Sequence, residues 1–127
     1  KAACTIYSES ATSIVEAMRD CAVKRLLVTS TALLFPSEKL RDRILGSIAR
    51  HNAHNADLME KAIRASDLEW TIARLGFLNG KSSLDFRLAE GALPDGAKSL
   101  SRAAVARFLL AEAEQPNNLN TVVGLCG

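Results

Sequence analysis

Two short segments carry the side chains that could take part in chemistry. Thr29-Ser30-Thr31 follows one apolar run, and Arg74-Leu75-Gly76-Phe77 ends another. Where such runs form the strands of an open α/β sheet, ligands collect beyond the carboxyl ends of those strands. A serine hydroxyl at such a place can hydrogen-bond a cofactor or a substrate, or it can satisfy its own backbone. These two segments are therefore where we expect a binding site.

A phosphate-binding loop and a metal site are the other candidates, and both are incomplete. Residues 76–82, Gly-Phe-Leu-Asn-Gly-Lys-Ser, resemble a P-loop, but three residues separate the glycines where a P-loop needs four. No helix is predicted after Ser82. His51 and His54 are about one helical turn apart, with Asp57 as the only carboxylate near them, so a solvated or helix-capping pair is the better interpretation. The sequence predicts no metal site.

Two further side chains receive structural interpretations, Glu60 as a surface charge on a helix and Trp70 as core on one face of a strand. The three cysteines are far apart and lack the paired spacing of a zinc site, so a reduced intracellular setting is the simplest interpretation. No apolar run approaches the ~20 residues that span a bilayer, and no basic-then-apolar leader opens the sequence. We expect a cytoplasmic protein without a membrane partner.

The elements that position these residues alternate along the chain. Strands are predicted near Leu26 to Thr29, Glu69 to Arg74 and Thr121 to Cys126, because each run is short and rich in strand formers. Parallel neighbours need helical crossovers, so strands that alternate with helices indicate an α/β fold. We expect a mainly parallel sheet with helices on both faces.

Three helices are predicted between and after these strands. The first covers about residues 8–22, with Ser8, Ser10 or Thr12 as its N-cap. The second covers about 37–65, either unbroken or interrupted near Gly46 or near residues 51–55. The third runs from Arg102 to Glu114, capped by Ser101 and stopped by Pro116. From Leu75 to Lys98 the chain is glycine-rich, and we expect a long loop there with one short strand at 84–88.

The composition describes an ordinary globular chain. Its 127 residues are 48% hydrophobic and 24% charged, which is enough for one domain with a sizeable core. The 16 basic and 14 acidic residues leave a net charge of +2 and form no run of one sign. A nucleic-acid partner is therefore not expected.

Four motifs, in the same order along the chain, resemble those of one protein family. They are Ser13-Ile14-Val15-Glu16-Ala17-Met18 with Val23-Lys24-Arg25-Leu26-Leu27-Val28-Thr29-Ser30, Ala65-Ser66-Asp67-Leu68 with Thr71-Ile72-Ala73-Arg74, Ala89-Glu90-Gly91-Ala92-Leu93-Pro94, and Ser99-Leu100-Ser101-Arg102-Ala103-Ala104-Val105-Ala106. The chain resembles the C-terminal half of the atypical short-chain dehydrogenase/reductases, in their flavin-reductase and NmrA-like group. The resemblance implies a partial NAD(P)-binding Rossmann-type fold, one domain over residues 1–127, without the N-terminal glycine-rich half.

This resemblance implies roles for the two strand-end segments toward an NADP or NAD cofactor. Ser30 matches a serine beside the nicotinamide ring, and Thr29 and Thr31 are weaker candidates because they adjoin it. Arg74-Leu75-Gly76-Phe77 occupies the place of the family's Arg-Pro-Pro-x-Leu turn, whose backbone faces the nicotinamide carboxamide. The prolines are absent here, which makes the turn more flexible. The alternative for Arg74 is an arginine that caps the sheet edge through surface pairing.

A substrate wall is implied by the same resemblance. Leu33, Leu34 and Phe35 match an apolar surface against which a planar, flavin-like small molecule would lie. A core or flap segment is an equal alternative for these three residues.

The sequence departs from the wider reductase pattern in two places. Tyr7 is the single tyrosine, so no Tyr-x-x-x-Lys pair can donate a proton, which is normal in the flavin-reductase branch. No Gly-x-x-Gly-x-x-Gly turn is present between a strand and a helix, so the helix N-terminus that would hold a pyrophosphate is missing. We expect these 127 residues alone to bind a dinucleotide poorly.

Two functions of different classes follow. The first is an NAD(P)H-dependent oxidoreductase that reduces a flavin or similar planar substrate once a nucleotide-binding half is supplied. The second is a catalytically inactive binding module that dimerises through a bare sheet edge, since an uncovered strand edge is a template for pairing. Either way the small core favours a homo-oligomer.

Overall fold

The computed structural model describes residues 5–36 and 47–127, and the chain forms two compact units. The first unit comprises Lys1–Leu26 and Pro36–Trp70, and the second comprises Leu27–Phe35 and Thr71–Gly127. The predicted helical stretch at 37–46 lies outside the described residues, so the predicted interruption near Gly46 does too.

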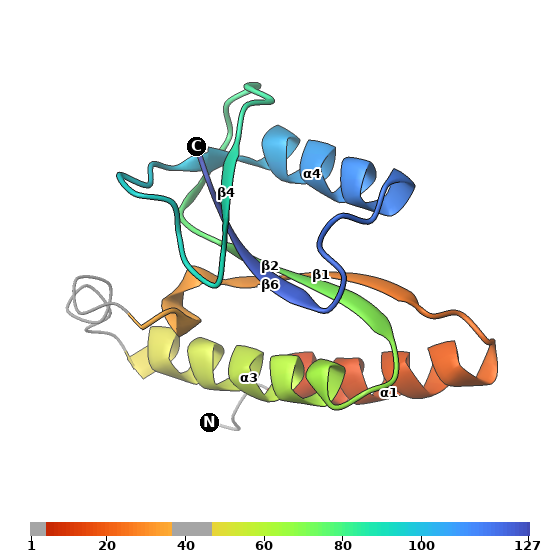
Figure 1. The fold of residues 1–127 in the computed structure, drawn as a ribbon. Helices are drawn as coiled ribbons and strands as arrows, with labels where there is room; N and C mark the ends of the chain where they lie inside the picture. Colours follow the sequence, from red (N-terminus) through yellow and green to blue (C-terminus); the bar gives the residue numbers. More distant parts are fainter. Residues whose placement is uncertain (1–4, 37–46) are drawn as a thin grey trace. The chain divides into compact units, whose positions relative to one another are not determined.

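The first unit is a pair of helices packed side by side, α1 (Ile6–Asp20) and α3 (Ser47–Arg64) (Figure 1). Apolar residues at helical spacing fill the interior of the unit, namely Ala11 and Val15 of α1 and Ala56, Met59 and Ile63 of α3. Both helices overlap the ranges predicted for them, 8–22 and 37–65, and α3 is unbroken through residues 51–55. The N-cap prediction for α1 was wrong, because the cap position is Thr5 and its side chain makes no cap bond. Asn55 supplies one bond instead, accepting from the Ser8 amide at 3.2 Å.

Glu60 corrects a second interpretation, because it is buried rather than a surface charge. It is 1% exposed on α3, and its Oε2 lies 2.7 Å from Nη2 of Arg64, one turn later. A buried carboxylate without a partner would be costly, and the pairing with a half-exposed arginine lowers that cost. His51 and His54 on the same helix are exposed, as the solvated interpretation requires.

The sheet has the strand order β1-β2-β6-β4 among the described residues. The strands are β1 (Arg25–Thr31), β2 (Glu69–Leu75), β4 (Arg87–Glu90) and β6 (Thr121–Cys126). β2 and β6 pair in parallel, Arg74 opposite Gly124, whereas β4 runs antiparallel to β6. The three principal strands lie where the apolar runs predicted them, and the sheet is mainly parallel.

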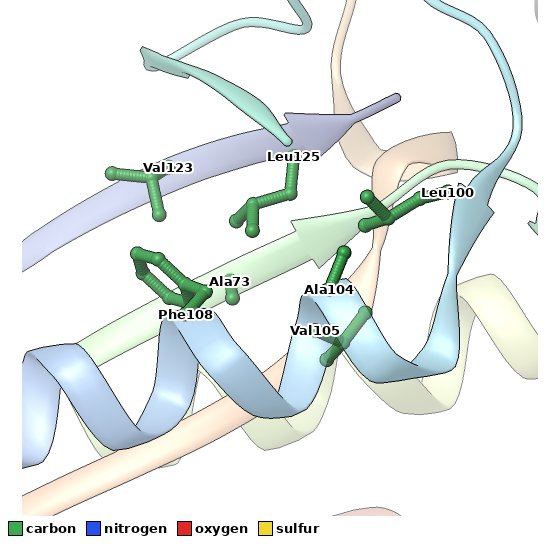
Figure 2. Packing of buried hydrophobic residues seen from close by; sticks show 7 residues of the cluster. All are labelled: Ala73, Leu100, Ala104, Val105, Phe108, Val123 and Leu125. Atoms are coloured by element: carbon green, nitrogen blue, oxygen red, sulfur yellow. The ribbon is translucent and has the colours of Figure 1, made fainter. Parts of the chain in front are cut away.

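The core of the second unit lies between this sheet and α4 (Arg102–Glu114) (Figure 2). Figure 2 shows the side chains of the cluster meeting between helix and strands; they are Ala73, Leu100, Ala104, Val105, Phe108, Val123 and Leu125. Phe86 packs edge-on against Phe108, with ring centroids 5.7 Å apart. The helix has its predicted bounds, and Ser101 caps it by accepting a hydrogen bond from the Ala104 amide at 2.9 Å.

The segment between β2 and α4 is more ordered than the expected loop. β3 (Leu78–Asn79) pairs in parallel with β5 (Leu100–Ser101) in a separate two-stranded sheet. The predicted strand at 84–88 is displaced, since β4 begins at Arg87 and pairs with β6 through Glu90. Residues 80–86 form no helix, so the P-loop resemblance has no structural counterpart there.

Candidate functional site

The carboxyl end of β1 turns sharply into a short 3-10 helix, η1 (Ala32–Leu34). Thr31 starts that turn, because its Oγ1 accepts a hydrogen bond from the Leu33 amide at 3.3 Å. Ser30 is half-buried, whereas Thr29 is exposed. Of the three residues, Thr31 therefore caps the turn into η1, and Ser30 and Thr29 lie beside it at the strand end.

Arg74, near the carboxyl end of β2, contacts Phe35, which directly follows η1. The guanidinium carbon of Arg74 lies 4.7 Å from the centroid of the Phe35 ring, within the range of a cation–π contact. Arg74 is 9% exposed and Phe35 is 6% exposed. The surface-pairing alternative for Arg74 is therefore wrong. Arg74, in one of the two segments singled out in the sequence, therefore contacts Phe35, which follows the other segment at the end of η1.

Gly124 is the residue that lets Phe35 pack so closely. A Cβ added to Gly124 would lie 2.9 Å from Cε2 of Phe35 and would overlap the carbonyl of Ala92. Gly124 is also the register partner of Arg74 across the β2–β6 pairing. Neither Gly124 nor Ala92 was a predicted site residue, although Ala92 lies in one of the four family-like motifs. A glycine inside an apolar strand pattern was the available signal, because it marks a close approach of another chain segment.

The three residues after Arg74 have different surroundings. Leu75 is half-buried and packs against the core beneath α4. The Gly76 amide lies 3.4 Å from the Leu125 carbonyl, and a Cβ on Gly76 would make only an ordinary contact at 3.8 Å. Phe77 is 67% exposed, and its carbonyl accepts a hydrogen bond from the Leu100 amide at 2.8 Å.

The predicted apolar wall divides in the same way. Leu33 and Leu34 are half-buried, and Phe35 is buried against Arg74 and Gly124. The burial of Phe35 fits the alternative that this residue is part of the core rather than of a substrate-binding wall. The apolar groups left accessible around the strand ends are those of Leu33, Leu34 and Phe77.

The groups at the two strand ends fit the nicotinamide end of a dinucleotide better than its pyrophosphate. Ser30 and Thr29 provide hydroxyl donors and acceptors at a strand end, and the backbone of 75–77 follows the neighbouring strand. Both features fit a nicotinamide with its carboxamide. The sequence has no glycine-rich turn opening a helix, which is the feature that fits the pyrophosphate.

The described part of the chain shows neither a metal-binding cluster nor a membrane-spanning helix. Residues 5–36 and 47–127 contain no cluster of three or more His, Cys, Asp or Glu side chains that could hold a metal ion. No helix within those ranges has both the length and the apolar character needed to cross a membrane.

Comparison with solved structures places the fold in the Rossmann class. A short-chain dehydrogenase/reductase from Veillonella parvula DSM 2008, solved with NADP, is 22% identical with a TM-score of 0.77, over 94% of this chain and 58% of that one. A Rossmann-fold NAD(P)-binding family protein from Shigella flexneri is 26% identical with a TM-score of 0.70, over 94% and 53%. A candidate NADH-flavin reductase from Streptococcus pneumoniae TIGR4 is 18% identical with a TM-score of 0.76, over 99% and 68%.

The family follows from the sequence itself. Residues 2–116 match the model of an NAD(P)H-binding family, so the chain belongs to that family. No curated protein matches the chain closely enough to add a relative. The chain spans little more than half the length of the first two structures above. It is therefore an α/β chain of Rossmann type that corresponds to part of those longer proteins.

Proposed function

We propose that the chain is the substrate-side part of an NAD(P)H-dependent oxidoreductase that reduces a flavin or a similar planar molecule. The observation that carries this proposal is the contact between Arg74, near the carboxyl end of β2, and Phe35, at the end of the short helix η1 that follows β1. In a Rossmann-type sheet that edge is where ligands bind. Family membership and the likeness to a candidate NADH-flavin reductase support the same chemistry.

Each residue of the site has a distinct role in this proposal. The Ser30 hydroxyl hydrogen-bonds the carboxamide or the substrate, and the backbone of Gly76 and Phe77 lines the neighbouring strand end. Arg74, held beneath Phe35, fixes the η1 segment against β2 and so positions Ser30. The bound nicotinamide supplies the hydride, and the protein supplies orientation and electrostatics.

A catalytically inactive binding module is the second candidate function. The observation that favours it is the lack of a Gly-x-x-Gly-x-x-Gly turn in these residues. A chain that holds no pyrophosphate still offers the Leu33, Leu34 and Phe77 surface to a planar ligand. The experiments below separate the two functions.

Replacing Ser30 tests the reductase proposal. In a chain extended at its N-terminus by a glycine-rich half from a family relative, Ser30→Ala should lower the turnover of NADPH-dependent flavin reduction by about tenfold or more. That is the scale of one lost transition-state hydrogen bond of about 1.5 kcal/mol. The rate is measured as NADPH oxidation at 340 nm.

The matched control is Ser82→Ala, because Ser82 is exposed and lies outside the site. It should leave turnover unchanged, and both variants should unfold at the temperature of the parent chain. Full activity in Ser30→Ala would remove this serine from the mechanism. An extended chain that binds flavin but oxidises no NADPH would favour the binding module.

A further inference from the structure

The outward face of α4 carries an open apolar groove of about 550 Å³ in the second unit. It is lined by Leu84, Ala103, Ala106, Arg107, Leu110, Ala111 and Glu114. The α4 residues among them recur every three or four positions, so they share one face of the helix. Ala104, Val105 and Phe108 are buried on the opposite face, beneath the helix. The groove is therefore separate from the core and made of surface that nothing in the unit covers.

The apolar part of this groove is accessible to solvent. Leu110 is 65% exposed and Leu84 is 50% exposed, with alanines on both sides of Leu110 along the helix. Small side chains allow the backbone of a second helix to approach closely. The groove therefore combines exposed apolar side chains with the charged side chains of Arg107 and Glu114 on one helix face.

The rim of the groove carries one basic and one acidic side chain, so the rims of two copies can be complementary in charge. Arg107 and Glu114 are seven residues apart, two helical turns, and Leu110 lies between them on the same face. When two α4 helices cross antiparallel about a two-fold axis near Leu110, Arg107 of each copy faces Glu114 of the other. A two-fold interface uses the same patch on both partners, so such self-complementarity is what it requires.

We propose that this groove is the contact surface between two copies of the chain, which pair through antiparallel α4 helices. Burial of Leu110 of one copy against Leu84 and the alanines of the other drives the association. The two exposed Arg107–Glu114 pairs contribute little affinity but select the antiparallel register, because every other register leaves like charges or unpaired charges together. Arg107 also lies 3.4 Å from the Leu84 carbonyl through Nη1, which ties the rim of the groove to its floor.

Sedimentation velocity over about a hundredfold range of protein concentration measures this association, since dimerisation follows mass action. The unaltered chain should shift from monomer to dimer, and Leu110→Glu should weaken the dimer by at least tenfold, because it places a charge at the centre of the contact. Leu119→Glu is the matched control, since Leu119 is 45% exposed and lies outside the groove. It should leave the dissociation constant unchanged.

Charge reversal tests the register. Arg107→Glu and Glu114→Arg should each weaken self-association, whereas an equimolar mixture of the two variants should form a heterodimer in which acidic and basic rims face each other. Circular dichroism confirms that each variant is folded. A chain that stays monomeric, a dimer unaffected by Leu110→Glu, or a mixture no tighter than the single variants would overturn the proposal. A dimer that is lost only when the exposed edge of β1 is altered would assign the contact to the sheet instead.

Discussion

Gly124 is the residue at which the packing around the candidate site is tightest. Its position opposite Arg74 leaves room for the Phe35 ring on one side and the Ala92 carbonyl on another. No larger residue fits unless the η1 segment or the chain around Ala92 moves. The glycine therefore determines how closely the end of β1 approaches the middle of the sheet.

Gly124→Ala should destabilise the chain by about 1 to 3 kcal/mol, the usual cost of overpacking a closed site. Urea unfolding monitored by circular dichroism measures the change. Gly80→Ala is the control, because a Cβ there meets nothing within 4 Å. Equal stability of the two variants would show that the β1 end is not packed as described.

The role of a single residue could be predicted from the sequence where that role depends only on its neighbours along the chain. Ser101 was identified as a helix cap because a serine three positions before Ala104 can reach its amide. Glu60 was misassigned because an acidic residue on a helix is usually exposed, and its burial on α3 is a tertiary effect that no local pattern indicates. The Arg74–Phe35 contact joins residues far apart in sequence, so no local pattern could indicate it.

The connection from α4 to β6 is held by one buried carboxylate. Glu112 is 4% exposed, and its two oxygens accept hydrogen bonds from the backbone and side-chain amides of Asn118 at 2.7 and 2.8 Å. The Asn118 carbonyl in turn accepts a hydrogen bond from the Thr71 hydroxyl at 2.6 Å. Helix, turn and strand β2 are thus linked through Asn118, which fixes where β6 begins.

Glu112→Gln keeps the shape of the side chain but replaces one acceptor by a donor that faces an Asn118 N–H. The loss should be about 1 to 3 kcal/mol, the cost of leaving a buried donor unsatisfied. Thermal unfolding measures it, and Glu16→Gln, at an exposed position of α1, should change the midpoint far less. A midpoint for Glu112→Gln equal to that of the parent chain would contradict this role.

The longer elements were predictable because hydrophobic periodicity decides them. β1, β2, β6 and α4 lie at or within a few residues of their predicted bounds. β4 was displaced because its register is fixed by pairing with β6, which is a tertiary effect. β3 and β5 have two residues each, too few to show an alternating pattern.

At the scale of the whole molecule, the chain corresponds to part of the Rossmann-type structures that it resembles. It belongs to an NAD(P)H-binding family and covers little more than half of the first two structures reported above. β1 is the terminal strand of the described sheet at the side away from β4. In the enzyme that we propose, a glycine-rich half pairs with this edge and adds the phosphate-binding turn that these residues lack.

Titration with NADPH by isothermal calorimetry tests the central claim most directly, using the 127-residue chain and the same chain joined to a glycine-rich half. The account predicts binding to the joined chain that is tighter by at least about a hundredfold, or about 2.7 kcal/mol, since pyrophosphate is held by a helix N-terminus that only the joined chain has. Equal affinity of both chains, or no binding to the joined chain while it remains folded, would contradict the account.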